Sequence, residues 1–437
     1  MHVKYYLYTI LTLMLFGVPA VSSRFGNQVN EISQIFSETT DQVASVLTAL
    51  ISHNPKSVAD LKSDYNQPIV TVSSINAATV QPKVRILIVP GHEPNYGGAE
   101  FGSLKEREMT VELGQDLLTF LNANSHYQTF VTRDDSAWMP TFADYFKNDW
   151  NDILAWEKAS IQDMAHRISI GESTPPVSTV YHNSAPANVA TRLYGITKWA
   201  NENNIDITIH IHFNDDTVHP AGVPGTHSGF AIYIPEHQYA NSTSSKALAE
   251  SVFKRLSRYS PVSDLPGESS GVVEDPDLIA VGAHDTADAA SMLIEYGYIY
   301  ESQFADPDTR SLALKDLAFQ TYLGLQDFFD PSNVVPAGLS YDTIALPHSW
   351  SQPFSGKDSS NSPNIDTFAL QTAMLFDGEY PPSSKDMNQC PRSGKFGLCT
   401  KQALQAFQDK YSITGEKDSV GLKTLQVLNT NFGARTI

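Results

Sequence analysis

The stretch VRILIVPGH, residues 84–92, decides the class of fold because an unbroken apolar run ends there in a sharp turn. Val, Ile and Leu in such a run are typical of a strand that is buried on both faces of a sheet. A helical pattern begins near Leu104, and strand-like runs then alternate with helical stretches. The further strand-like runs lie at 127–133, 205–213, 229–235 and 291–297. This alternation predicts an α/β domain in which a mixed, mostly parallel sheet carries helices on both faces.

The bulk composition limits the functions that the chain can have. At 437 residues it is too long for one ordinary hydrophobic core, so we expect two or three domains. Its 29 Lys and Arg against 48 Asp and Glu leave a formal net charge of −19. Because nucleic-acid binding needs clustered cations to neutralise phosphates, we expect no nucleic-acid partner.

Residues 1–23, MHVKYYLYTILTLMLFGVPAVSS, join a short basic start to an apolar run and a stretch of small residues. This pattern predicts a secretory signal peptide, with Ala20 and Ser22 placed for cleavage. An uncleaved membrane anchor is the alternative, although the apolar run is short for a membrane span. We therefore expect a protein that is secreted or held in the cell envelope (periplasm or cell wall), with no stable membrane insertion after signal cleavage.

The rest of the chain divides where the texture of the sequence changes. Residues 24–83 have helix-like apolar spacing and carry no chemistry that the sequence reveals. The α/β pattern occupies 84–330, and a Pro-, Ser- and Asn-rich stretch without periodicity follows at 331–360. That stretch is typical of a linker, and a compact helical segment at 361–432 comes after it.

Two histidines lie close together in ITIHIHFND, residues 207–215. In a strand His210 and His212 would face the same side, because side chains two positions apart do so. The pair alone fits two interpretations, either a metal-binding strand end or incidental polar residues on an exposed face of the sheet.

Three further polar residues stand at strand ends or in adjoining turns, where open α/β sheets bind ligands. His92 follows the first strand-like run, Glu106 opens the next helix, and Glu295 lies in the last strand-like run. A hydrolytic zinc ion takes about three His, Asp or Glu ligands and leaves one position open for water. A further carboxylate is then needed to relay a proton. Two histidines and two glutamates meet that requirement.

The motifs around these residues resemble a known family in their order along the chain. They are ILIVPGHEPNYGGAEFG, LKEREMTVELGQDL, FVTRDD, IHIHFND and ASMLIEYGYI, within residues 84–329. This set resembles the zinc-dependent N-acetylmuramoyl-L-alanine amidases of the amidase 3 family. The resemblance implies a phosphorylase/hydrolase-like fold and hydrolysis of the amide between N-acetylmuramic acid and L-alanine. The implied substrate is peptidoglycan, that is, glycan strands with stem peptides.

The resemblance also implies roles for individual residues. His92, Glu106 and His212 would bind one Zn²⁺ ion in the catalytic domain, and Glu295 would be the catalytic carboxylate. Three other side chains are candidates for orienting these ligands or for contacting substrate. They are Asn214, which completes the family's His-x-Asn, Arg133, which matches its Thr-Arg, and His210, which stands where the family usually has Ser. His210 could orient the metal ligand, or it could be a satisfied polar side chain.

Two departures from the family pattern leave alternatives open. The usual Gly after the first ligand is Glu93 here, which would be either a rim carboxylate near the metal or a solvent-facing side chain. An insert at about 135–185 is longer than the family leads us to expect. It would form either the buried face of a helical hairpin or a lid or glycan-contacting surface. Its aromatic residues include Trp138, Phe142, Tyr145, Phe146, Trp150 and Trp156.

The C-terminal segment has a resemblance of its own. Its motifs FALQTAMLF, FGLCTKQALQAFQ and GLKTLQVLN resemble the peptidoglycan-binding domain 1 family. The resemblance implies a small three-helix bundle that binds the wall; a structural appendage without wall affinity is the alternative. The only two cysteines, Cys390 and Cys399, lie close together in CPRSGKFGLC and predict a local disulfide rather than a zinc site.

We therefore expect a monomeric, secreted cell-wall amidase. Two alternatives of different classes stay open. One is another zinc peptidase or amidohydrolase on the same scaffold, acting on wall peptides. The other is a non-catalytic wall-binding protein that retains the site residues without turnover.

Overall fold

The computed structural model describes residues 54–67, 83–182, 184–216, 219–332, 341–356 and 362–434, all within one compact unit. The predicted signal peptide, most of 24–83 and much of the predicted linker lie outside the described residues. Within the described ranges, none of the helices combines the length and the apolar character needed to cross a membrane.

A six-stranded mixed sheet forms the centre of the α/β domain, in the order β4-β1-β5-β8-β6-β7. The four strands β4, β1, β5 and β8 are parallel, whereas β6 runs antiparallel to β8 and β7 runs parallel to β6. The strands are β1 Val84–Pro90, β4 Tyr127–Val131, β5 Ile207–Asn214, β6 Ala231–Pro235, β7 Val272–Asp275 and β8 Ala290–Tyr298. The predicted fold class is confirmed. The short edge strand β7 was not predicted, because four residues that end in two acids carry too little apolar pattern to reveal a strand.

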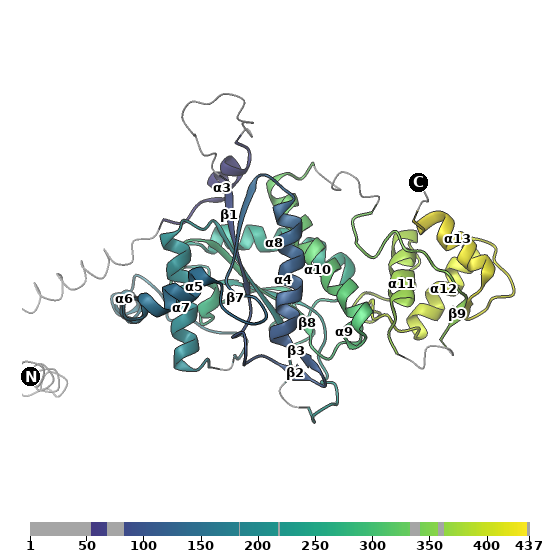
Figure 1. The fold of residues 1–437 in the computed structure, drawn as a ribbon, viewed down its shortest axis with the longest axis horizontal. Helices are drawn as coiled ribbons and strands as arrows, with labels where there is room; N and C mark the ends of the chain where they lie inside the picture. The colour runs from purple at the N-terminus through teal and green to yellow at the C-terminus, as the bar shows by residue number, and fades with distance from the viewer. Residues whose placement is uncertain are drawn as a thin grey trace, which may run out of the picture. The chain divides into compact units, whose positions relative to one another are not determined.

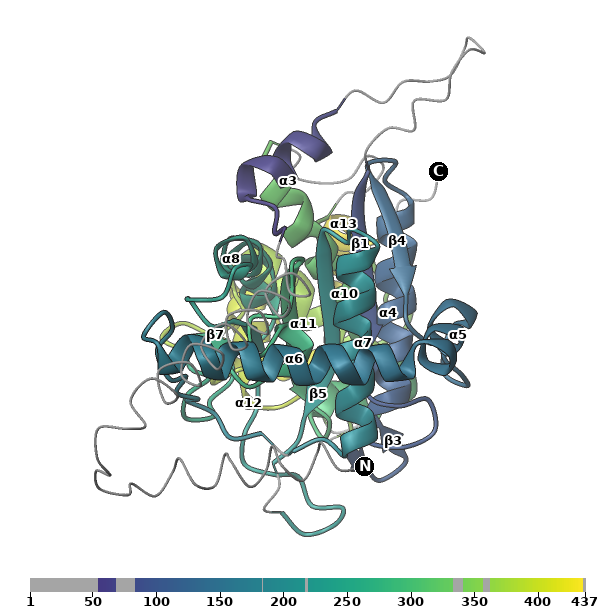
Figure 2. The ribbon, with the colours of Figure 1, turned by 90° about the vertical axis from the view of Figure 1, so that its left-hand side faces the viewer.

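Helices cover both faces of this sheet, as Figures 1 and 2 show. Ile86 and Ile88 of β1 face one layer, and the alternate Leu87 and Val89 face the other. The first layer contains α4 Glu106–Asn122, α8 Ser242–Tyr259 and α10 Pro307–Phe329. The second layer contains α5 Pro140–Asn148, α6 Trp150–Ser169 and α7 Ala187–Glu202.

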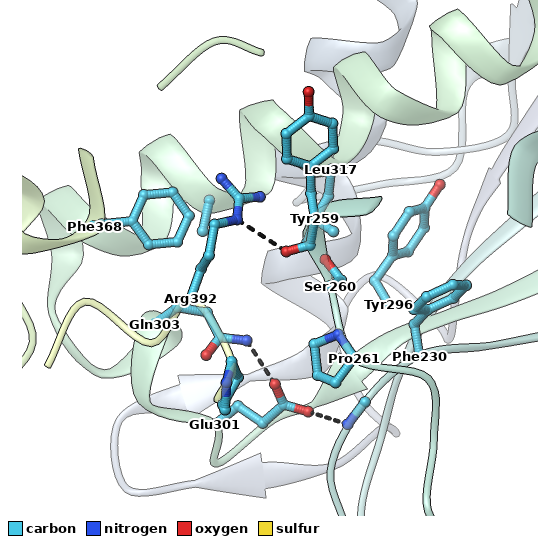
Figure 3. Close-up of a pocket in the computed structure, with 13 residues that line it drawn as sticks. Phe230, Tyr259, Ser260, Pro261, Tyr296, Glu301, Gln303, Leu317, Phe368 and Arg392 are labelled. Atoms are coloured by element: carbon cyan, nitrogen blue, oxygen red, sulfur yellow. Dashed lines mark hydrogen bonds between the residues drawn. The ribbon is translucent and has the colours of Figure 1, made fainter. Parts of the chain in front are cut away.

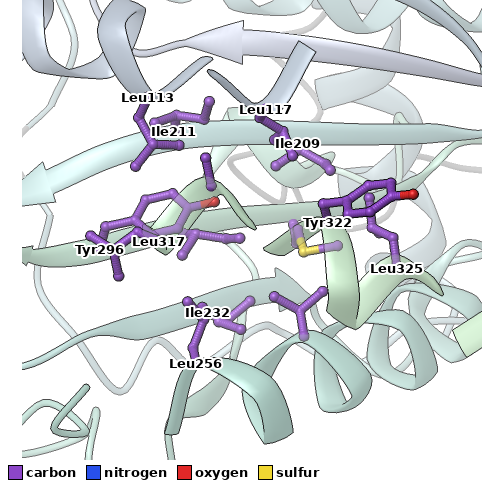
Figure 4. Packing of buried hydrophobic residues seen from close by; sticks show 14 of the residues in the cluster. Leu113, Leu117, Ile209, Ile211, Ile232, Leu256, Tyr296, Leu317, Tyr322 and Leu325 are labelled. Atoms are coloured by element: carbon purple, nitrogen blue, oxygen red, sulfur yellow. The ribbon is translucent and has the colours of Figure 1, made fainter. Parts of the chain in front are cut away.

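The larger hydrophobic core lies in the first layer. Figure 4 shows Leu113 and Leu117 of α4 close to Ile211 and Ile209 of β5. Full burial of one such aliphatic side chain contributes about 1.5–3 kcal/mol. The alternation of β5 therefore puts its isoleucines into this core and its two histidines on the opposite face.

The insert packs through its aromatic side chains. Phe142 and Phe146 of α5 and Trp156 of α6 are buried against α7. Trp138, Tyr145 and Trp150 are half-buried against the same cluster. The interpretation of the aromatic spacing as the buried face of two helices is therefore confirmed for Phe142, Phe146 and Trp156, whereas Trp138 precedes α5. The lid interpretation stays a prediction.

A short helix from the N-terminal segment also belongs to the core of the α/β domain. It is α3, Val58–Tyr65, and Ser57 caps its first turn while the Asp60 carboxylate accepts from the Ser57 N–H. Leu61 is fully buried and Tyr65 nearly so, both in the first-layer core. The described part of 24–83 is thus docked on the α/β domain.

The C-terminal region contains three helices around a core of its own, as predicted. They are α11 Ile365–Asp377, α12 Leu398–Lys410 and α13 Leu422–Phe432. Trp350, from the stretch predicted as a linker, is buried in this core. The predicted disulfide joins Cys390 and Cys399. The remaining short elements are β2 Glu100–Phe101, β3 Leu104–Lys105, η1 Ile279–Val281, α9 Ser302–Ala305, β9 Phe354–Ser355 and β10 Ser419–Val420.

A buried arginine joins this helical region to the α/β domain. Arg392 donates through Nε to the Tyr259 carbonyl at 2.9 Å and through Nη2 to the Asp316 carboxylate at 2.8 Å. Its guanidinium lies 4.9 Å from the ring centroids of both Tyr259 and Phe368. Figure 3 shows Arg392 beside Tyr259 and Phe368, at a small pocket that all three help to line. The helical region is therefore held against α8 and α10 by directed polar contacts.

Candidate metal centre

The first candidate ligand sits in a tight turn directly after β1. His92 has a left-handed backbone with φ of 68°, which is uncommon for a residue other than glycine. The preceding Gly91 lies so close to the His212 ring that an added Cβ would come within 2.4 Å of it. Gly98, at φ of +84°, likewise leaves room for the His92 ring and the Glu106 carboxylate. The glycines of the PGH and YGGA motifs thus let two histidines and a carboxylate approach one another.

Glu106 joins the two histidines. It is the first residue of α4 and is 4% exposed. Its Oε1 atom lies 2.8 Å from Nε2 of His92 and 3.0 Å from Nδ1 of His212. Backbone N–H groups hold the carboxylate, because Phe213 donates to Oε1 at 3.0 Å and Ala99 to Oε2 at 2.8 Å.

The electrostatics of this group favour an ionised Glu106 carboxylate beside a neutral His212 imidazole. Burial alone would raise the pKa of Glu106, but the attraction of His92 and the hydrogen bond with His212 outweigh it and hold the pKa well below its usual range. Burial lowers the pKa of His212, although Glu106 opposes this shift. Ionised carboxylate and neutral imidazole are the forms that bind a metal ion.

The geometry of the three residues fits a small divalent metal ion. One ligand atom of each of His92, Glu106 and His212 lies within 4.8 Å of the other two. Nε2 of His92 is buried and, despite its 2.8 Å distance from Glu106, has no partner with hydrogen-bond geometry among the described residues. Two imidazole nitrogens and one carboxylate oxygen match the ligands of a catalytic zinc site, which keeps a position open. The structure brings together all three predicted ligands.

Glu295 lies beside this group on the neighbouring strand. In the parallel pair of β5 and β8, Glu295 is directly opposite His212. Its Oε2 atom is buried and has no hydrogen-bond partner within the described ranges. Burial, and then the negative charges of Glu106 and Glu268, hold the pKa of Glu295 well above its usual range. A carboxyl group that retains its proton in this way is suited to donate that proton to a leaving group.

His210 faces the same side of β5 as His212, one layer deeper. It is 2% exposed and lies between Val89 of β1 and Leu293 of β8. Neither ring nitrogen has a hydrogen-bond partner among the residues that the structure describes. Burial, assisted by the nearby His212, lowers the pKa of His210 to about 3. The interpretation as a satisfied polar side chain is therefore wrong for the described contacts, and a supporting role under the site stays a prediction.

Arg133 lies beneath the His92 turn and is 1% exposed. Its guanidinium donates to the Pro90 carbonyl at 3.2 Å, to the Gly91 carbonyl, and to the Arg107 carbonyl at 3.0 Å. Burial lowers its pKa to about 10. An arginine enclosed in this way braces the backbone that carries His92 and is not exposed for contact with a substrate.

The other two candidates are also held by protein groups. Asn214 donates to Glu268 at 3.2 Å, and its side-chain oxygen accepts from the Asp215 N–H at 2.9 Å. The pairing of β5 with β8 becomes irregular between His212 and Asn214, which is common beside functional sites. Glu93 is only 5% exposed, so the interpretation as a solvent-facing side chain is wrong.

One site residue was not predicted from the sequence. Glu268 is 1% exposed and accepts hydrogen bonds from Asn214, Tyr233 and Ser263. It lies in the turn before β7, within LPGESSG, where neither strand nor helix periodicity gives a signal. Its carboxylate contributes to the charge that Glu295 experiences.

The fold and the site define an α/β protein with a candidate metal centre at the carboxyl ends of its parallel strands. A family model described as N-acetylmuramoyl-L-alanine amidase (Amidase_3) matches residues 86–306, slightly more than half of the chain. The chain belongs to this family. No curated protein matches the chain.

Several solved structures are similar in part to this chain. An N-acetylmuramoyl-L-alanine amidase from Clostridium difficile 630 is 16% identical with a TM-score of 0.36, covering 57% of this chain and 98% of its own. An N-acetylmuramyl-L-alanine amidase from Mycobacterium smegmatis is 15% identical with a TM-score of 0.38, covering 57% and 98%. The amidase AmiC2 of Nostoc punctiforme is 17% identical with a TM-score of 0.34, covering 56% and 96%. The family match, and not these distant likenesses, carries the assignment.

Proposed function

We propose that this protein is a secreted, zinc-dependent N-acetylmuramoyl-L-alanine amidase that cleaves the amide between N-acetylmuramic acid and L-alanine of peptidoglycan. The family match supports the amidase class. The observation that carries the finer proposal is the convergence of His92, Glu106 and His212, with Glu295 opposite His212 on the next strand.

The three converging residues would hold the metal ion. Zinc, when bound, lowers the pKa of water to about 7 and polarises a carbonyl oxygen. His92 and His212 would supply imidazole nitrogen atoms, and Glu106 would supply a carboxylate that two backbone N–H groups fix in place. The mixed nitrogen and oxygen ligand set supports zinc over calcium or magnesium, which prefer oxygen ligands alone.

Glu295 would perform the proton transfers. As a carboxylate it accepts a proton from the attacking water, and as a carboxylic acid it donates that proton to the departing amine of L-alanine. The amide bond breaks and a new bond forms between the carbonyl carbon and the water oxygen, so the products are a carboxylic acid and a free amine. The raised pKa of Glu295 supports the donation step.

The remaining parts of the chain support a role at the cell wall. The C-terminal helices would bind peptidoglycan and raise the local concentration of substrate around the catalytic domain. Asn214, held by Glu268, would stabilise the end of β5, and Arg133 would stabilise the His92 turn. We propose a monomer whose signal peptide is removed on secretion, which mass spectrometry of the N-terminus of the exported protein would test.

Metal analysis combined with product identification on purified cell wall tests the catalytic proposal. We expect about one zinc per chain and new N-terminal L-alanine after digestion. Release of D-alanine instead would favour a zinc carboxypeptidase on the same scaffold. Wall binding without any product would favour a non-catalytic wall-binding protein.

A further inference from the structure

The residue that follows the first candidate ligand is held on both of its carboxylate oxygens. Oε1 of Glu93 accepts from Nε of Arg192 at 2.8 Å, and Oε2 accepts from Nε1 of Trp138 at 3.2 Å. The side chain is nearly enclosed, at 5% exposure. Because each oxygen has a partner, Glu93 is not directed at the metal centre as a further ligand.

The backbone of the neighbouring His92 is strained, so contacts that hold Glu93 also help to hold His92 in its conformation. A left-handed φ of 68° at a residue other than glycine is unfavourable and persists only where the surroundings enforce it. On the N-terminal side of His92, Arg133 donates hydrogen bonds to the carbonyl groups of Pro90 and Gly91. On the C-terminal side, the next residue in the chain is Glu93, and Trp138 and Arg192 hold its side chain in place.

The two anchors are connected to each other. Trp138 pairs through its backbone with Arg133 in an isolated antiparallel bridge, so one short segment reaches both sides of the His92 turn. Trp138 also packs its ring edge-on against Phe146 of α5, with 5.0 Å between the ring centroids. Arg192 comes from α7 and donates in addition to the Tyr96 hydroxyl at 3.0 Å. The start of the insert and the helix after it thus meet at Glu93.

We propose that Glu93 is a positioning residue that fixes the strained turn of His92 for metal binding, and that Trp138 and Arg192 hold Glu93 in place. This inference rests on the proposed metal centre. Under this proposal Trp138, at the start of the insert, both packs in the hydrophobic layer and holds a residue of the site. Residues that orient a metal ligand typically contribute about 10–100-fold to metal affinity.

The test measures the dissociation constant of Zn²⁺ for the purified full chain by competition with a chelating dye. We expect Glu93→Gln, which keeps the size and removes the charge, to weaken zinc binding about 10-fold. Glu108→Gln is the matched control, because Glu108 pairs with Lys105 on the exposed side of α4 and its side chain is 55% exposed. It should leave the dissociation constant unchanged.

Trp138→Phe provides a second and milder test, because it keeps an aromatic ring against Phe146 and removes only the N–H donor. We expect a loss of affinity of about 3-fold, below the usual range because Arg192 still holds one oxygen. This variant decides the question if Glu93→Gln fails to fold, as judged by the melting temperature of the metal-free protein.

If Glu93→Gln folds, a zinc affinity within about 2-fold of the wild type in that variant would overturn the inference, whatever the change in melting temperature. If it does not fold, the same result in Trp138→Phe would overturn it. His92→Ala separates this failure from a failure of the metal centre. Loss of zinc in His92→Ala with wild-type affinity in Glu93→Gln rejects the positioning role alone. Retention of zinc in His92→Ala rejects the metal centre that both proposals need.

Discussion

The two ends of the central sheet differ in whether their buried polar groups have hydrogen-bond partners. At the carboxyl ends of β1, β5 and β8, buried atoms of His92 and Glu295 have no hydrogen-bond partner within the described residues. At the amino ends of β1 and β5, the buried Asp206 accepts from the Arg85 N–H at 2.7 Å and pairs with Lys56 at 2.5 Å. An unpaired buried polar group costs about 1–3 kcal/mol, so the unpaired Oε2 atom of Glu295 lowers the stability of the carboxyl end. The first end carries the proposed metal centre, and at the second end polar groups pair with one another.

The burial of hydrophobic groups differs between the two ends as well. At the amino end, α3 places Leu61 in the core and stacks Tyr65 against Phe329, with 4.6 Å between the ring centroids. At the carboxyl end, Gly91 and Gly98 leave space that the His92 and His212 rings occupy. Substitutions at the two ends should therefore change different measured quantities.

The largest effect is expected from the candidate ligands. His212→Ala should weaken zinc binding by more than the roughly 10–100-fold that the loss of a supporting residue causes, because it removes a ligand atom. His210→Ala should keep stoichiometric zinc, because its ring is one layer deeper on the same strand. Metal analysis of the two purified variants compares them directly. Equal zinc contents would refute the assignment of separate roles to the two histidines.

Glu295→Gln should have the next largest effect, and on turnover alone. Removing a proton-transfer group lowers kcat by about 10²–10⁴-fold. Zinc content and binding to insoluble wall should stay at wild-type levels, because Glu295 is outside the converging group of three residues. Turnover and wall pull-down measured on one preparation separate these quantities. Substantial residual turnover would contradict the catalytic role.

The amino end should show the reverse pattern of effects. Leu61→Ala should lower the free energy of unfolding by about 2–5 kcal/mol, because it leaves a cavity where a fully buried side chain packs. Zinc affinity of the folded variant should match the wild type. Urea unfolding and zinc titration of the same protein measure both. A zinc defect without loss of stability would mean that the two ends are not independent.

The sequence predicted the carboxyl end better than the amino end. His92, Glu106, His212 and Glu295 stand in compact motifs, and the rule that ligands bind at the carboxyl ends of strands brings distant motifs together. The structure places all four together as that rule predicts. The docking of α3 was not predicted, because its eight residues give a pattern too short to reveal a partner.

Contacts between residues far apart in the sequence were beyond prediction. The partners of Glu93 are 45 and 99 positions away in the chain, and no local pattern indicates that a charged residue after a ligand becomes buried. Glu268 was missed for the same reason, since its partners come from β5, β6 and a loop. Periodicity reports which face of an element is buried, but not which polar groups meet there.

The smallest effect is expected at the ion pair below β5. Burial raises the pKa of Asp206 although the Arg85 N–H and Lys56 lower it, so these partners do not fully offset the cost of desolvation. Asp206→Asn removes that cost together with the ion pair and keeps an acceptor for the Arg85 N–H. We therefore expect it to lower the free energy of unfolding by only about 0.5–1.5 kcal/mol. Asp64→Asn is the matched control, because Asp64 contacts the same Lys56 at 2.6 Å but is more exposed, and it should cost about 0–1 kcal/mol. Urea unfolding of both variants measures the difference, and a loss above 3 kcal/mol in Asp206→Asn would show that this end depends on the ion pair rather than on the packing of α3.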